Sequence, residues 1–242
     1  MGKRTIISLL LFTGKRAASF SKAADKYYIT DILGGLSLAT LILSFSIVFT
    51  LNFTPLYNSE IKTQQIPETT GYSQEEIRAN YTTLIKWNSI LSKGPLKFPT
   101  MIMSDDGREH FVEVKRIFIA IQIAHIASSA LCLIFLVRRR KKSWIILMGG
   151  GAAAAAVPII AGIVFLIMGW DRFFVFFHQL MFDNELWLFD AKTDPIIRIL
   201  PDSFFMHCMF MIVGLIFFLA LSLFILGFIL RRRKHKQIPD SQ

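Results

Sequence analysis

Long apolar stretches alternate with polar and basic segments along this chain. A helix needs about 20 predominantly apolar residues to cross a hydrocarbon core of about 30 Å. Four stretches reach that length, at residues 29–51, 117–137, 144–168 and 204–230. The pattern therefore predicts an all-α polytopic membrane protein with four transmembrane helices, whose two ends lie on the same side of the membrane.

The segments around these helices define the expected domain organisation. A long polar loop precedes the second helix and a shorter one precedes the fourth, and together they are expected to form a small extracytoplasmic cap. The expected segments are a basic tail with a short interfacial helix over 1–28, a loop with a helix over 52–116, a basic turn over 138–143, a loop with an interfacial helix over 169–203 and a tail over 231–242.

The charge distribution orients this topology. The sequence has 27 Lys and Arg residues against 17 Asp and Glu, a net charge of +10, with 53% hydrophobic residues and a mean hydropathy of +0.50. The basic residues gather in the first tail, in the turn RRRKK and in RRRKHK near the end, whereas the acids gather in the two loops. By the positive-inside rule, both termini are cytoplasmic and both loops face outward. The basic surplus is thus a topology signal, which argues against nucleic-acid binding.

The first outer loop is expected to have structure of its own. The segment YSQEEIRANYTTLIKWNSIL predicts a helix over 74–91, because its apolar residues share one face and Ser73 and Glu76 form a capping box. We expect the apolar side of this helix to pack either on the membrane surface or on the second outer loop.

The stretch DDGREHFVEV leads into the second transmembrane helix and has two interpretations. Asp106-Gly107 between apolar alternations suits a hairpin turn. The preferred interpretation is that Asp105 or Asp106 caps a helix that runs straight into the membrane. In a helix His110 and Glu113 share a face, whereas in a strand they point to opposite sides.

The third span and the second outer loop contain two further patterns. The run GGGAAAAAVP, residues 149–158, lets another helix approach closely, and it is a packing device rather than a nucleotide loop. In WDRFFVFFHQLMF, Asp171 is expected to cap a helix that places His178 on an apolar face at the boundary between water and lipid. Trp170 and Trp187 suit the same depth as interface anchors.

Five histidines are the main candidates for chemistry, since the two cysteines lie inside predicted spans without zinc or redox spacing. His125 lies within the second span, where a hydrogen-bonded structural role is expected, while His207 opens the fourth span and His235 lies in the basic tail. His110 and His178 lie at the outer edge of the bilayer on separate segments, each followed by an acid. Two imidazoles at similar depth on one side indicate proton transfer.

Several other chemistries are excluded by the sequence. It has no HExxH, CxxC, GxGxxG or G-x-S-x-G motif and no acidic cluster with metal-ligand spacing. We therefore expect no metal and no cofactor, and a reaction that runs on acid-base chemistry at the membrane surface.

The stretch FFHQLMFDNELWLFDAKTDPIIRILPDSFF, residues 176–205, closely resembles the signature of the bacterial lipoprotein intramolecular transacylases. That signature places an aromatic-His pair, Asn and Trp, an Asp-x-Ile/Leu-Ile segment, and Pro with a Phe pair in this order. Two earlier segments are similar as well: GYSQEEIRANYTTLIKW resembles the family's Asn-Tyr helix, and HFVEVKRIF resembles its second histidine motif. The likeness covers about residues 30–230. The residues that match the signature are Phe177, His178, Phe182, Asn184, Trp187, Asp194, Ile197, Pro201, Phe204 and Phe205.

The resemblance implies an enzyme that moves the sn-2 acyl chain of a diacylglyceryl-modified lipoprotein cysteine onto that cysteine's own α-amine, giving the lyso form. It also implies that His178 and His110 are catalytic. We assign His178 as the general base and leave His110 to stabilise the oxyanion or protonate the leaving alkoxide. The family motif has aspartate where this chain has Glu113, a longer carboxylate that can still orient His110.

The expected partners are the diacylated N-terminal cysteine of a lipoprotein and membrane lipid, in the bacterial cytoplasmic membrane with the active site extracytoplasmic. The alternative function is a non-catalytic membrane protein that binds lipoproteins or lipids through its outer cap. Supporting or substrate-binding roles are expected for Glu113, Asn184, Trp187, Asp194 and Arg198.

Overall fold

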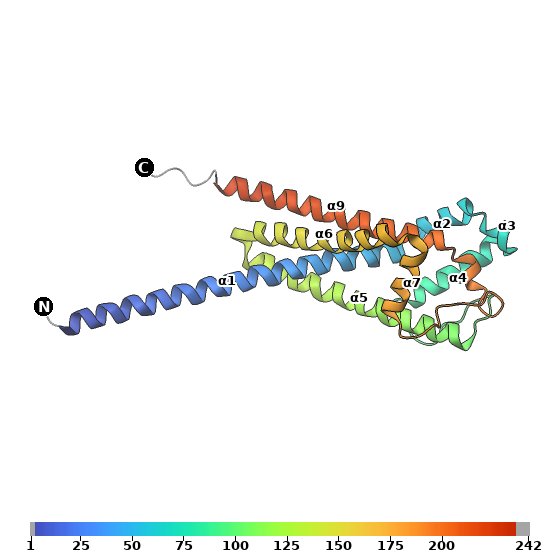
Figure 1. The fold of residues 1–242 in the computed structure, drawn as a ribbon, viewed down its shortest axis with the longest axis horizontal. Coiled ribbons are helices and arrows are strands. Elements are labelled where there is room, and N and C mark those ends of the chain that lie inside the picture. Colours follow the sequence, from blue (N-terminus) through green and yellow to red (C-terminus); the bar gives the residue numbers. More distant parts are fainter. Residues whose placement is uncertain (1–2, 236–242) are drawn as a thin grey trace.

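Four long helices form the body of the protein in the computed structural model, which describes residues 3–235 and, of these, the side chains of residues 28–234 (Figure 1). The long helices are α1 (Lys3–Asn52), α5 (Asp105–Arg138), α6 (Ser143–Met168) and α9 (Asp202–His235). The candidate membrane spans are Tyr28–Asn52, Asp105–Arg138, Arg140–Met168 and Asp202–Lys234. The expected all-helical fold with four spans is confirmed, and no strand occurs among the described residues.

Small residues bring α6 close to both of its neighbours. A Cβ atom at Gly150 would lie 2.8 Å from the Cβ of Leu38 and 2.9 Å from the carbonyl oxygen of Gly35, both on α1. A Cβ atom at Gly151 would lie 2.8 Å from the carbonyl oxygen of Ala220 on α9. Because these separations are shorter than a Cβ atom tolerates, glycine is needed for the helices to pack this closely. The prediction that GGGAAAAAVP is a packing device is confirmed.

A largely buried ion pair holds two helices together at the end of the bundle that contains the basic turn, which we call the basic end. The Arg139 guanidinium donates to both carboxylate oxygens of Asp31, at 2.6 Å each. The two side chains are only 10% and 13% exposed. A bidentate pair of this kind fixes α1 against the end of α5, just before the 3₁₀ turn η1 (Arg140–Lys142) leads into α6.

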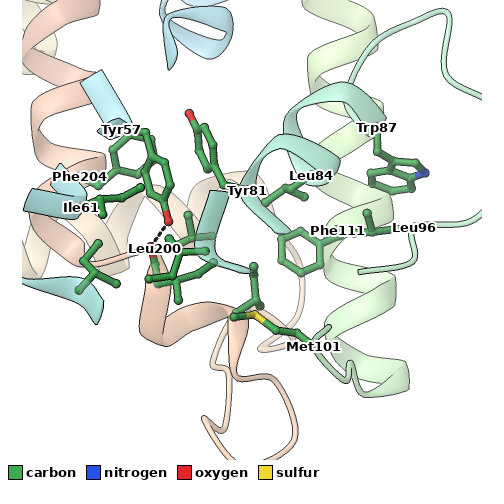
Figure 2. Packing of buried hydrophobic residues seen from close by; sticks show 14 residues of the cluster. Tyr57, Ile61, Tyr81, Leu84, Trp87, Leu96, Met101, Phe111, Leu200 and Phe204 are labelled. Atoms are coloured by element: carbon green, nitrogen blue, oxygen red, sulfur yellow. Dashed lines mark hydrogen bonds between the residues drawn. The ribbon is translucent and has the colours of Figure 1, made fainter. Parts of the chain in front are cut away.

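Four short helices belong to a cap at the opposite end, which we call the cap end: α2 (Thr54–Thr63), α3 (Ile66–Thr70), α4 (Gln74–Trp87) and α8 (Ile196–Ile199). Figure 2 shows the apolar core of the cap, in which the rings of Tyr57 and Tyr81 stack with centroids 3.6 Å apart and Phe204 of α9 packs edge-on against them. The Tyr57 hydroxyl donates to the carbonyl oxygen of Ile199 at 2.6 Å. The buried apolar residues of α4, among them Ile77 and Tyr81, share this core with Ile196 and Ile199 of the second outer loop. Of the two alternatives left open by the sequence, packing of α4 on the second outer loop is the one that the structure supports.

The start of α5 confirms the helix interpretation of DDGREHFVEV but corrects its cap. Ser104 is the capping residue, and its hydroxyl accepts a hydrogen bond from the Gly107 N–H at 2.9 Å. Asp105 and Asp106, the predicted caps, lie in the first turn, where their charges favour the positive end of the helix dipole. The serine precedes both aspartates, by one and two residues, and presents its oxygen at the distance that the free N–H groups require.

The start of α7 (Trp170–Met181) differs from the prediction in the same way. Gly169 precedes the helix with φ of 73°, a left-handed backbone conformation that glycine adopts readily. The chain turns there, and Figure 1 shows α7 running across the cap end of the bundle. Asp171 consequently lies in the first turn of α7 and does not cap it.

The predicted capping box of α4 is confirmed, whereas its predicted end is four residues too late. The Ser73 hydroxyl accepts from the Glu76 N–H at 3.2 Å, and the Glu76 carboxylate accepts from the Ser73 N–H at 2.9 Å. At the other end, the side chain of Gln122 donates to the Asn88 carbonyl at 2.9 Å and accepts from the Ile90 N–H at 3.0 Å. A side chain of α5 thus takes up backbone groups that another helical turn would have used.

Candidate active site

The structure brings His110 and His178 together from two different elements. His110 lies in the second turn of α5, and His178 lies near the end of α7. Their ring centroids are 6.3 Å apart, with an angle of 34° between the ring planes. Both rings can therefore reach one substrate group, as general acid-base catalysis by two side chains requires.

Two aromatic neighbours and one hydrogen bond at a ring nitrogen fix the orientation of His178. Its Nδ1 lies 2.8 Å from the carbonyl oxygen of Phe174, and because a carbonyl oxygen only accepts, Nδ1 carries the hydrogen. The indole of Trp187 stacks on the imidazole with centroids 4.8 Å apart, and the Phe174 ring lies at 4.2 Å. In the neutral ring, Nε2 is consequently the nitrogen with a free lone pair, which is the arrangement of a base.

Aromatic side chains also enclose His110, which is only 6% exposed. The Phe182 ring lies at a centroid distance of 4.9 Å and the Phe189 ring at 5.4 Å, both edge-on. The Nδ1 atom of His110 is buried without a hydrogen-bond partner among the described residues. A buried polar atom without a partner is costly, so this nitrogen is a candidate for contact with a substrate.

Burial keeps both histidines neutral near pH 7. It lowers the pKa of His110 to about 4, with a further contribution from the nearby His178. Burial also lowers the pKa of His178, although its hydrogen bond to the Phe174 carbonyl acts in the opposite direction. His110 precedes the apolar stretch 117–137 that is expected to cross the membrane, and His178 lies on α7, outside the candidate spans.

A chain of hydrogen bonds connects Glu113, Asn184 and Trp187, three of the predicted supporting residues. Asn184 donates from its side chain to Oε1 of Glu113 at 2.9 Å, and its backbone carbonyl accepts from the Trp187 indole N–H at 3.1 Å. Trp187 in turn stacks on His178, so it is part of the site and more than an interface anchor. Glu113 has no described hydrogen bond to His110, which means that it does not orient that ring in this structure.

The other two predicted supporting residues lie outside this cluster. Asp194 is buried and accepts from the Ser104 N–H at 2.9 Å and from the Thr193 hydroxyl at 2.8 Å. Arg198 donates to the carbonyl oxygen of Thr70 at 3.1 Å. Both side chains fasten the second outer loop to the rest of the cap, and neither has a described hydrogen bond with the two histidines.

Two further histidines have polar contacts elsewhere in the molecule. His125 lies 3.3 Å from the Ser44 hydroxyl, between α5 and α1, as expected for a structural residue inside the bundle. Nδ1 of His207 lies 2.6 Å from a carboxylate oxygen of Glu60, a buried acid that the sequence analysis treated only as a loop charge. Within the described part of the chain, no group of three or more His, Cys, Asp or Glu side chains could hold a metal ion.

Comparisons with known proteins point to one family. The family model for lipoprotein intramolecular transacylase Lit matches residues 32–205. The solved structure of the membrane-integral lipoprotein intramolecular transacylase Lit from Bacillus cereus has a TM-score of 0.84 to this chain at 30% identity, covering 88% of this chain and 100% of that one. Two structures of the same protein with one histidine replaced, by arginine or by alanine, have TM-scores of 0.79 at 29% identity and cover 93% and 91% of this chain. A comparison with curated protein sequences finds no match.

Proposed function

Because this chain belongs to the lipoprotein intramolecular transacylase family, we propose that it moves the sn-2 acyl chain of a diacylglyceryl-modified cysteine onto that cysteine's own α-amine. The product is a lyso-form lipoprotein. Family membership makes the chain an enzyme, which decides against the non-catalytic binding protein that the sequence left as an alternative. The observation that carries the catalytic part of the proposal is the pairing of the buried His110 with the half-buried His178, whose ring centroids are 6.3 Å apart.

The position of this pair suits a lipid-bound substrate. Val175, Phe176 and Leu180 of α7 are exposed next to the spanning helices, as in a helix that lies in a membrane interface. A diacylglyceryl-cysteine has its acyl chains in the bilayer and its ester and amine at the surface, so its reacting atoms lie at the depth of the two rings. The basic turn and tail lie at the opposite end of the bundle, which supports a cytoplasmic basic end and an extracytoplasmic site in a bacterial cell membrane.

In the proposed mechanism His178 is the general base. Its neutral ring uses Nδ1–H to bind the Phe174 carbonyl and accepts a proton at Nε2 from the substrate's α-ammonium. An ammonium of reference pKa about 7.7 to 8.0 loses its proton to a ring of pKa below 6.5 at a cost of at least about 2 kcal/mol. Effective molarities for groups held in attack geometry correspond to about 7 to 11 kcal/mol, which exceeds that cost.

The freed amine then attacks the sn-2 ester carbonyl. A bond forms between the amine nitrogen and the carbonyl carbon, and the bond from that carbon to the glycerol oxygen breaks. The nitrogen loses two protons in all, the one that His178 accepts first and a second one when the amide forms. One of them ends on the glycerol oxygen and the other is released to water, so that both histidines return to their neutral starting states. His110, held neutral by burial, has one N–H with which to stabilise the oxyanion or protonate the leaving oxygen. Trp187 positions His178 by stacking on it, and Asn184 ties the loop of Trp187 to Glu113 of α5, while Asp194 and Arg198 hold that loop in the cap.

Replacing His178 by alanine tests this function. We expect His178→Ala to insert and fold normally but to yield no lyso product, as measured by mass spectrometry of the N-terminal peptide of a co-expressed lipoprotein. His125→Ala is a matched control, because it removes an imidazole that lies between α5 and α1 rather than at the cap end. Lyso-lipoprotein at the wild-type level in the His178→Ala strain would overturn the proposed role of the histidine.

A further inference from the structure

A small charged cavity lies beside the histidine pair. Its volume is about 200 Å³, and its polar lining comes from Glu113 and Arg116 of α5 and from Asp183 and Asn184, which follow α7. Ile117, Met181 and Phe182 supply its apolar lining. The cavity is thus formed by the same two segments that hold the histidines, and it is too small to hold an acyl chain together with its headgroup.

One oxygen of Glu113 in this lining is buried without a partner. Oε1 accepts from Asn184 at 2.9 Å, but Oε2 has no hydrogen-bond partner among the described residues. Native proteins rarely leave a buried carboxylate oxygen in this state, because the loss of its hydration is not compensated. A donor from outside the chain would satisfy it.

The charges of the lining indicate what kind of donor fits. Glu113 and Asp183 contribute two carboxylates and Arg116 one guanidinium, and no ion pair of these three side chains is found within the described part of the chain. Two negatively charged hydrogen-bond acceptors suit a small cation with several N–H donors, and the guanidinium suits a carbonyl oxygen next to that cation. The N-terminus of a peptide offers both groups within one residue.

We propose that this cavity binds the free α-ammonium of the substrate cysteine through Oε2 of Glu113, with Arg116 binding the carbonyl oxygen of the same residue. The proposal rests on the proposed function and adds the subsite that recognises the unmodified N-terminus. Glu113 lies one turn after His110 on the same face of α5, so an ammonium on Glu113 lies within reach of the histidine pair.

The subsite also accounts for the release of the product. Acyl transfer converts the ammonium into a neutral amide, which has a single N–H donor and no charge to pair with Glu113. A hydrogen bond to a charged group typically contributes enough for a 10- to 100-fold difference in affinity, about the discrimination expected here between substrate and product. Lipoproteins that already have an acylated N-terminus are rejected for the same reason.

Binding of two lipopeptides to the full chain in lipid nanodiscs tests the subsite. Both probes are ether-linked dialkylglyceryl-cysteinyl peptides, which cannot react, and one has a free α-amine while the other is N-acetylated. We expect N-acetylation to weaken binding by about 10-fold or more in the wild type. Glu113→Gln keeps an acceptor for Asn184 and should reduce that ratio to about 3-fold or less.

Two more variants complete the design. Glu109→Gln removes an exposed carboxylate of the same helix and should leave the ratio unchanged. Arg116→Gln should weaken both probes by a similar factor, because both keep the carbonyl group. An unchanged ratio in Glu113→Gln, or a loss of the ratio in Glu109→Gln, would overturn the proposal. Since the probes do not react, this outcome is independent of whether His178→Ala abolishes activity.

Discussion

The hydrogen bond from Asn184 to Glu113 holds the second outer loop against α5, and Asn184→Asp should turn it into a repulsion that depends on pH. The substitution is nearly isosteric, and it replaces the donor that lies 2.9 Å from Oε1 of Glu113 with a second carboxylate oxygen. Two like charges at that distance repel by about 1.4 kcal/mol in water and by about 6 kcal/mol at an effective dielectric constant of 20. Asn184 is partly buried, so the expected penalty lies between these limits.

Protonation of one carboxylate limits this penalty and makes it depend on pH. Neutralising an aspartate of reference pKa about 3.9 costs about 5 kcal/mol at pH 7.5 but only about 2 kcal/mol at pH 5.5. The pair raises the pKa of one carboxyl in the folded state, so the destabilisation is complete above that raised pKa and disappears below the unfolded value. The protonated form also donates a hydrogen bond to Glu113 again. Asn184→Asp should therefore recover stability as the pH falls.

Hydrogen exchange of the substrate-free protein in nanodiscs measures this effect locally. In Asn184→Asp at pH 7.5, we expect the amides of residues 182–190 to exchange at least about tenfold faster than in the wild type. At pH 5.5 these amides should regain up to about 3 kcal/mol of protection. Each comparison is made with the wild type at the same pH. Asn184→Ala is the matched control, because it removes the donor without adding a charge. It should lose about 1 to 3 kcal/mol of protection against exchange, by the same amount at both pH values. Equal losses in the two variants at both pH values would refute the reasoning.

Two further predictions concern the bundle and the base. Gly151→Ala should lower the free energy of unfolding in detergent by about 1 to 3 kcal/mol, because the new Cβ would lie 2.8 Å from the Ala220 carbonyl oxygen. Gly162→Ala, whose Cβ would have no atom within 4 Å, should instead raise that free energy by up to about 1 kcal/mol through helix propensity. Thermal shifts of the same sign for both variants would contradict the close packing of α6 and α9. The kcat for acyl transfer should fall at acid pH only below pH 6.5, because burial lowers the pKa of the proposed base, His178. A decline that begins above pH 6.5 would contradict that proposal.

The transmembrane part of the fold could be predicted from the sequence because its signal is local. In a bilayer each spanning segment must satisfy its own backbone hydrogen bonds, so a long apolar stretch predicts a helix without reference to its neighbours. The capping box of α4 is equally local, since Ser73 and Glu76 are three residues apart. The core of the cap is different: Tyr57 donates to Ile199, and no periodicity in either segment indicates that pairing.

The wrong prediction of the α5 cap also has its cause in a contact between distant segments. Ser104, Asp105 and Asp106 are adjacent and can all cap a helix, so local propensity does not choose between them. The choice is made by Asp194, which accepts from the Ser104 N–H and so fixes where the extended chain ends. Asp194 follows 90 residues later in the sequence, and its effect appears only when the second outer loop is folded onto α5.

The chemistry of the site depends on contacts that the sequence did not indicate. The histidines could be found from their depth. Phe182 stood out only as a match to the family signature and Phe189 not at all among the 23 phenylalanines, and no local pattern indicated that these two rings enclose His110. An exposed histidine of reference pKa about 6.5 is partly protonated near neutral pH and is then a poorer base. The aromatic enclosure prevents this partial protonation by lowering the pKa of both rings. The Phe174 carbonyl selects the tautomer of His178 that has its lone pair on Nε2.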